Sequence, residues 1–176
     1  MKKERKEEKN LIYYFLSALN ICFFDKEAMK KISIDSRATI FAFIIIILEG
    51  IAQAVGQKNW WGMAVLPILG LLIFPISAGI MHGIARLFRG KAHYINLLRA
   101  SGFGSLIGVL FVFPLKENAL VFLTLFLLLW SIAIDTIIVS EIYKIKKWQS
   151  ATAVIIQTAI MIVILALITY ATGMKA

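Results

Sequence analysis

Long apolar runs, separated by short polar or charged segments, dominate the chain after residue 37. Five of these runs predict helices, at about residues 38–55, 61–87, 94–113, 119–142 and 148–170. Each run is long enough for a helix to cross a hydrocarbon layer of about 30 Å. A helix satisfies its own backbone groups in lipid, and none of the runs has the alternating pattern of a barrel strand. The pattern therefore predicts an all-α, polytopic membrane protein with five transmembrane helices.

The apolar run before the first predicted span is shorter. As a helix, residues 11–24 would be about 21 Å long, which is too short to cross the hydrocarbon layer. Tyr13, Ser17 and Asn20 fall on one face of that helix. We therefore expect a short amphipathic helix that lies in the membrane interface.

The first 37 residues are expected to form a cytosolic part that is distinct from the spans. Residues 25–37 carry several cations and predict a second short helix. No small-x-small cleavage site follows Phe24, so the run before it is not expected to be a signal peptide. We predict a basic tail with interfacial helices at residues 1–37 and a five-span domain at residues 38–176.

Composition excludes a water-soluble globular domain. Of 176 residues, 60% are apolar and 16% are charged, and the mean hydropathy is +0.84. Soluble domains have roughly 45–50% apolar and about 25% charged residues. The single cysteine, Cys22, cannot form an internal disulfide, and no Cys/His spacing suggests a zinc site. No metal or cofactor is expected.

The net charge of +9 is distributed as in a membrane protein. Of the 19 Lys and Arg residues, 15 lie before the first span or in the second and fourth loops between spans, and three lie on the other side. By the positive-inside rule the N-terminus is cytosolic and the C-terminus external. We expect the cytosolic cations to contact anionic lipid headgroups rather than nucleic acid. The membrane-surface set is Lys26, Lys30, Lys31, Arg37, Arg86, Arg89, Lys91, Lys144, Lys146 and Lys147.

Small residues at helical spacing predict close helix packing. Gly79 and Gly83 form one GxxxG pair in the second span, and Gly104 and Gly108 form another in the third, where Gly102 also lies. Such pairs let helix backbones approach closely in lipid. The favoured interpretation is that the second and third spans pack together. The alternative is a seam between two copies of the chain.

Four ionisable side chains fall inside predicted spans: Glu49, His82, Arg99 and Asp135. Placing each in lipid is costly, so each needs a partner or a function. Arg99 and Asp135 are predicted at matching depths in neighbouring antiparallel spans, so we expect them to form an ion pair, with His82 near the same depth. The alternative is an ion or proton path. Glu49 lies towards the external end and is not expected to join the pair.

Residues 84–91 (IARLFRGK) and residues 97–106 (LLRASGFGSL) are two stretches that resemble the central signature of the Yip domain. The first is similar to its helix end and glycine-containing loop, and the second to the helix that follows. Trp130, Lys147 and residues 20–24 (NICFF) are similar to further positions of that family. The resemblance implies five spans and a cytosolic N-terminus.

Departures from the family pattern limit what the resemblance implies. Arg89 occupies the position of the family's second glycine, and Ile107 that of its usual proline. The Asp-Leu-Tyr-Gly-Pro motif of eukaryotic members, which interact with Rab (Ypt) GTPases, is absent. The chain resembles a compact prokaryotic-type member, which implies the prokaryotic cytoplasmic membrane and does not carry over a GTPase partner.

The leading expectation is a non-enzymatic membrane protein that acts as a scaffold or interaction partner at the cytosolic face, as the Yip family does in membrane trafficking and organisation. Its partners would be lipid and another membrane or cytosolic protein, or a second copy. The alternative is a small transporter or channel component that uses Glu49, Arg99 and Asp135. A third interpretation, an intramembrane hydrolase, would use Ser105 and His82, but the Gly-x-Ser-x-Gly context is missing.

The predicted orientation is directly testable. Reporter domains fused at residues 58, 116 and 175 should all report an external position, because the sides that hold them carry few cations. Alkaline phosphatase and fluorescent-protein fusions measure this in cells. A cytosolic signal from the fusion at residue 175 would contradict the orientation.

Overall fold

The computed structural model describes residues 11–113 and 117–172, and the regular structure within these ranges is helical. Five segments are long and apolar enough to cross a membrane. They are α3 (Ala38–Gly56), α4 (Gly62–Leu87), α5 (Tyr94–Gly104) with its continuation η1 (Ser105–Val112), α6 (Glu117–Tyr143) and α7 (Lys147–Thr172). These bounds confirm the five predicted segments to within a few residues.

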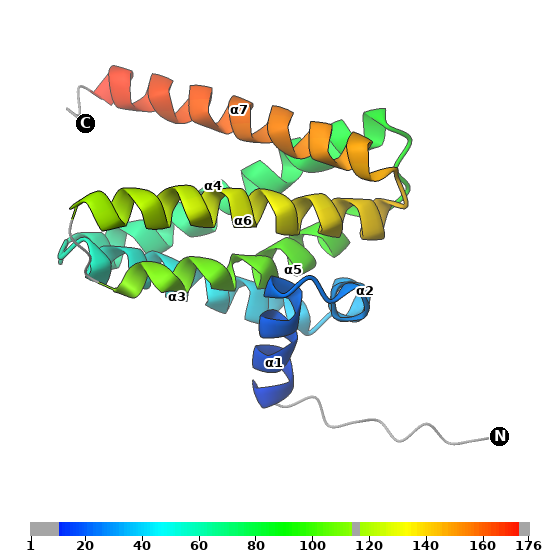
Figure 1. Cartoon of the computed structure of the whole chain (residues 1–176), viewed down its shortest axis with the longest axis horizontal. Helices are drawn as coiled ribbons and strands as arrows, with labels where there is room; N and C mark the ends of the chain where they lie inside the picture. The colour runs from blue at the N-terminus through cyan, green and yellow to red at the C-terminus, as the bar shows by residue number, and fades with distance from the viewer. Residues whose placement is uncertain (1–10, 114–116, 173–176) are drawn as a thin grey trace.

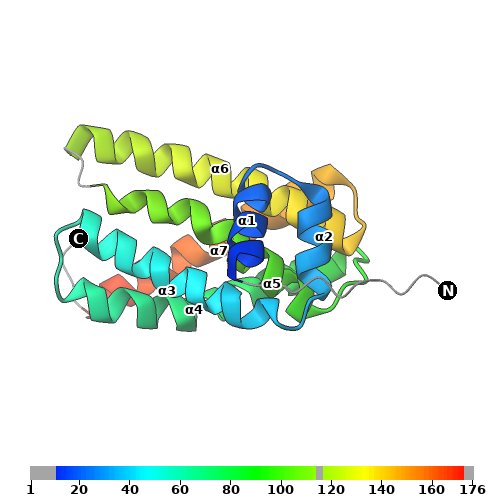
Figure 2. The same ribbon diagram turned by 90° about the horizontal axis from the view of Figure 1, so that it is seen from below.

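Two short helices precede the spans, as the sequence predicts. They are α1 (Leu11–Cys22) and α2 (Lys26–Ile34). The Asp25 carboxylate accepts hydrogen bonds from the backbone N–H groups of Glu27 and Ala28, which caps the start of α2. The spans run along the long axis of the molecule, whereas α1 and α2 lie across it (Figures 1 and 2).

Both short helices pack towards one end of the bundle, which we call the basic end. Its loops are residues 88–93, between α4 and α5, and residues 144–146, between α6 and α7. The loop at residues 57–61, between α3 and α4, lies at the opposite end. We use "outer half" for the half of each span that lies nearer that opposite end.

The third span is not the single α-helix that the sequence predicts. After Gly104 it tightens into a 3-10 helix of eight residues. Glycines at 104 and 108 weaken the α-helix here, and the Ser105 hydroxyl donates to the Gly102 carbonyl at 3.0 Å. A 3-10 helix rises about 0.5 Å more per residue than an α-helix, so η1 lengthens the span by about 4 Å.

The core lies where α1 and α2 meet the spans. Tyr14, Met29, Phe103 and Ile138 are fully or almost fully buried there. The ring of Tyr14 stacks on Phe41 with centroids 4.0 Å apart. Its hydroxyl donates to the Asp35 carboxylate at 3.1 Å. Burial, together with this bond, raises the pKa of Tyr14 to about 12, so the phenol stays a neutral hydrogen-bond donor.

The end of α1 contacts the middle of α6. The indole of Trp130 donates to the Cys22 carbonyl at 3.0 Å, which gives this mid-span tryptophan its partner. The Cys22 thiol faces the Gly104 carbonyl at 3.7 Å. Burial raises the pKa of Cys22 to about 11, so the thiol is protonated and unreactive at neutral pH.

The polar face expected on α1 is wrong in one respect. Asn20 is exposed, but Ser17 is only 7% exposed and its hydroxyl donates to the Tyr13 carbonyl at 2.8 Å. Because this bond satisfies the hydroxyl, Ser17 packs against the protein. The outward face of α1 is instead strongly apolar, and it includes Leu11, Ile12, Phe15 and Leu16.

The glycines pack the third span against α3 and α6, not against α4. A Cβ at Gly102 would lie 2.7 Å from the Ala42 Cβ of α3, and one at Gly104 would lie 2.9 Å from Ile134 of α6. Within the described chain, a Cβ at Gly79 or Gly83 would meet nothing within 4 Å. The expected packing of the second span on the third through these two glycines is therefore wrong.

Gly50, which the sequence analysis did not single out, makes the close contact between α3 and α4. A Cβ there would lie 2.7 Å from the backbone nitrogen of Pro67 and 2.9 Å from the carbonyl carbon of Leu66. The neighbouring atoms are backbone atoms and cannot move aside. The sequence signal was a small-xxx-small pair, because Ala54 lies four positions after Gly50.

Alanine substitutions separate the packed glycines from the free ones. Gly50→Ala and Gly102→Ala should each lower the stability by about 1–3 kcal/mol, because the added methyl overpacks a helix contact. Gly79→Ala and Gly83→Ala are the matched controls and should cause no loss, because alanine favours the helix by about 0.5–1 kcal/mol. Thermal unfolding in detergent measures both effects. A loss at Gly79 equal to that at Gly50 would contradict this packing.

Candidate functional site

A cavity of about 360 Å³ lies among the five spans. This volume is within the range of sites for small organic ligands, roughly 300–1,000 Å³. Residues from all five spans line it, and most of the lining is apolar. Its polar lining residues are Glu49, Ser77, Ser101, Ser105, Thr124, Ser131, Asp135 and Gln157.

Glu49 enters the cavity from α3 opposite a glycine of η1. A Cβ at Gly108 would collide with the Glu49 carboxylate, so the bare glycine backbone makes room for this side chain. The Ser105 hydroxyl lies beside the same carboxyl group. In the lining of the same cavity, the Gln157 amide donates to the Ser77 hydroxyl at 2.6 Å and so joins α7 to α4.

Asp135 lines the same cavity from α6, next to the Ser101 hydroxyl of α5. Glu49 and Asp135 are close enough to interact electrostatically. Among the described residues that line this cavity there is no Lys, Arg or His. Two carboxylates in a medium of low dielectric repel each other, so they require shared protons or a positively charged partner.

A second cavity of about 340 Å³ lies between α3 and α4. It shares Glu49, Phe74 and Ser77 with the first cavity and adds Gln53, one helical turn closer to the opposite end. Glu49 therefore lies where the two cavities meet. The polar groups of Gln53, Glu49 and Asp135 follow one another through the interior of the bundle.

The structure does not bring together the four ionisable residues that the sequence singled out. Glu49 and Asp135 share the cavity, but His82 and Arg99 do not line it. Nδ1 of His82 is hydrogen-bonded to the Tyr143 hydroxyl near the basic end. The expected cluster is therefore one pair of acids and two separate structural side chains.

The predicted ion pair between Arg99 and Asp135 is wrong. The Arg99 guanidinium donates to the Thr39 hydroxyl at 2.8 Å and to the Ser33 carbonyl at 3.2 Å. These partners fix α5 against α2 and α3. Asp135 instead lies next to the Ser101 hydroxyl. Ser101 follows Arg99 by two residues, which corresponds to a rotation of about 200° around the helix. Arg99 and Ser101 therefore lie on opposite faces of α5, and Ser101 is the residue that faces Asp135.

The serine and histidine of the hydrolase interpretation are not partners. The Ser105 hydroxyl donates to the Gly102 carbonyl, and His82 is bonded to Tyr143. Nucleophilic catalysis by serine requires a base within hydrogen-bond reach. In the part of the chain that the structure describes, these two residues form no such dyad.

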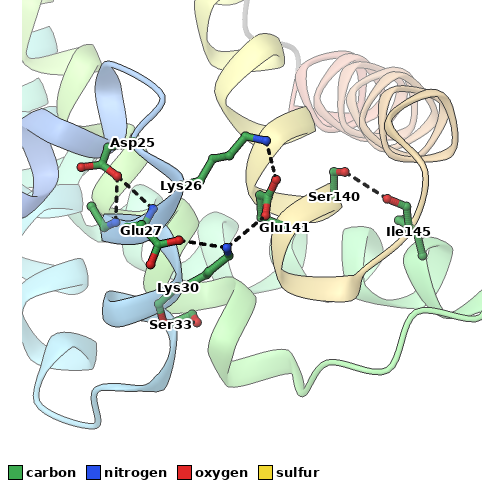
Figure 3. A network of polar contacts seen from close by, with 9 residues as sticks. Asp25, Lys26, Glu27, Lys30, Ser33, Ser140, Glu141 and Ile145 are labelled. Atoms are coloured by element: carbon green, nitrogen blue, oxygen red, sulfur yellow. Dashed lines mark hydrogen bonds and ion pairs between the residues drawn. The ribbon is translucent and has the colours of Figure 1, made fainter.

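Two of the predicted surface cations have an acidic partner that the sequence analysis missed. Nζ of Lys26 lies 2.7 Å from Glu141, near the end of α6, and Nζ of Lys30 lies 3.6 Å from the other oxygen of the same carboxylate. Lys30 also contacts Glu27 at 3.1 Å (Figure 3). These contacts join α2 to α6. The other eight cations of the predicted membrane-surface set are exposed.

Comparisons with family models, with curated proteins and with solved structures find no match for this chain. The resemblance to the Yip domain therefore rests on the motif residues alone and stays a prediction.

Substitutions distinguish the hydrogen bonds of Arg99 from the ion pair with Asp135 that the sequence predicts. Arg99→Gln should lower the stability by about 1.5–3 kcal/mol, because charge-assisted hydrogen bonds to Ser33 and Thr39 are lost. Asp135→Asn should cause no comparable loss. The matched control is Lys91→Gln, which removes an exposed cation near the start of α5. Unfolding by denaturant in detergent measures all three variants.

The ion pair would instead be supported if Arg99→Gln and Asp135→Asn lowered the stability equally and the exchange of Arg99→Asp with Asp135→Arg restored it. That result would contradict the contacts of Arg99 with Ser33 and Thr39.

Proposed function

We propose that this multi-pass membrane protein binds a small organic cation between its spans and acts as a transporter or channel component. One observation carries the proposal: two carboxyl groups share a cavity within the membrane-spanning region, and no basic residue is among its described lining residues. Ionisable residues at such positions are costly, so they mark ligand or ion pathways more often than structural contacts.

The size and lining of the cavity support an organic cation over a bare metal ion. A volume of about 360 Å³ exceeds what one ion with its ligands occupies, and the remaining lining is apolar. Phe74 and Phe111 line the same cavity, and aromatic faces attract a desolvated cation. Hydroxyl groups such as those of Ser105 and Ser131 supply hydrogen bonds that fix orientation.

The transporter interpretation changes in one detail. Glu49 and Asp135 remain its ligand-binding residues, whereas Arg99 belongs to the contact between α5, α2 and α3. A scaffold at the cytosolic face, similar to Yip-family proteins, is the alternative function, and its surface would be the exposed cations of the basic end. A location in the prokaryotic cytoplasmic membrane is part of both proposals.

Uptake into proteoliposomes tests the proposal. Radiolabelled tetraethylammonium should enter vesicles that contain the protein when an inside-negative potential is imposed. Glu49→Gln and Asp135→Asn should each lower uptake by about tenfold or more, which corresponds to losing about 1.4 kcal/mol of cation stabilisation. Glu141→Gln is the matched control, because it makes the same chemical change on α6 outside the cavity.

Two outcomes would contradict the proposal. Wild-type uptake equal to that of protein-free vesicles would overturn transport and leave the scaffold as the favoured function. Rubidium uptake with tetraethylammonium excluded would overturn the organic cation as the ligand.

A further inference from the structure

We propose that a surface at the basic end binds the phosphodiester headgroup of an anionic phospholipid. This headgroup surface consists of Arg86, Arg89, Lys91, Lys144, Lys146, Lys147 and Trp148. It comprises two loops that are far apart in the sequence and the helix ends that flank them. It is independent of the cavity between the spans.

Direct contacts join the two loops. Gly90 of the first loop packs on the Tyr143 ring, where a Cβ would lie 2.6 Å from the Tyr143 Cδ1. The rings of Phe88 and Trp148 meet edge to face with centroids 6.2 Å apart. His82 bonds the Tyr143 hydroxyl and fixes that ring. The six cations are therefore held on one surface.

This surface carries a large excess of positive charge. The sequence has no Asp or Glu between Glu49 and Glu117 and none after Glu141. Glu141 interacts electrostatically with Lys144, but its ion pairs are with Lys26 and Lys30. The six cations are exposed, and none forms an ion pair with an acidic side chain of the described chain. Such a cluster attracts anions.

Apolar side chains beside the cations favour a phospholipid over a soluble phosphate. Trp148 is 62% exposed and Leu87 is 82% exposed. Tryptophan is enriched at the level of lipid headgroups, where its ring contacts the acyl region and its N–H faces water. Basic clusters at the ends of transmembrane helices recognise anionic headgroups. A lipid supplies both the phosphate and the chain that these residues would contact.

Two of these cations occupy backbone positions that suit glycine. Arg89 has φ of 65° and Lys144 has φ of 57°, and each follows the end of a span. Side chains other than glycine are disfavoured in this left-handed region. Glycine at these positions would relieve strain while removing a charge, so stability and lipid binding should change in opposite directions.

Native mass spectrometry of the detergent-purified full chain, titrated with phosphatidylglycerol or phosphatidylcholine, tests this surface. The wild type should retain phosphatidylglycerol preferentially. The double variant Arg89→Gly, Lys144→Gly should bind it about tenfold or more weakly, with an unchanged or raised melting temperature. Lys58→Gly is the matched control, because Lys58 has φ of 53° at the opposite end of the bundle. It should leave lipid binding unchanged.

Several outcomes would overturn the headgroup surface. Equal retention of phosphatidylglycerol by the double variant, or an equal loss in Lys58→Gly, would remove the site. Binding of inorganic phosphate that displaces phosphatidylglycerol would assign the surface to a soluble anion. Preferential binding of a short oligonucleotide would assign it to nucleic acid. Trp148→Ala with unchanged lipid preference would exclude the apolar contact that favours a lipid.

Discussion

The cost of leaving a polar group without a partner in lipid is the constraint on which the rest of this structure depends. Arg99 satisfies it with the Thr39 hydroxyl and the Ser33 carbonyl, and Trp130 satisfies it with the Cys22 carbonyl. All three bonds join a span to a segment that precedes the first span or begins it. These contacts hold α1, α2 and the start of α3 against the later spans, and the bond between Gln157 and Ser77 joins α7 to α4 in the same way. Glu49 and Asp135 differ from these residues, because they line a cavity and have serine hydroxyls beside them instead of an ion pair in the described chain.

Close contact between helix backbones makes room for the acidic side chains in the interior of the bundle. Gly50 brings α3 against the backbone of α4, and Gly102 brings α5 against α3. Gly108 then leaves space for the Glu49 side chain. Small residues in membrane helices are usually discussed as packing devices. Here the same residues determine which polar side chains enter the interior, so a glycine contact and an acidic cavity belong to one arrangement.

The sequence predicted the spans well because length and hydropathy act on each segment alone. It predicted relationships between segments poorly, because these depend on the rotation of each helix. Depth along the bundle paired Arg99 with Asp135, but Ser101 on the other face of α5 meets Asp135. Gly79 and Gly83 form a motif as regular as Gly104 and Gly108, yet only the second pair meets neighbouring side chains within the described chain. No local pattern in the sequence distinguishes these cases.

Packing along α6 is uneven, and this matters for access to the cavity. Towards the basic end, Ile134, Ile138 and Tyr143 are buried, and Glu141 is bound to α2. In the outer half, Val121, Phe122, Leu125 and Leu129 are exposed, and the exposed Thr124 lines the cavity.

Regions with few buried contacts move at the lowest free-energy cost. Any change in the width of the cavity is therefore expected in the outer half of α6, with the basic end as the fixed part. The acids would stay in place because Asp135 lies on the packed side of this boundary and Glu49 is held between Gly108 and Ser105. A ligand would then enter past Thr124 without disturbing the contacts that join α2 to α6.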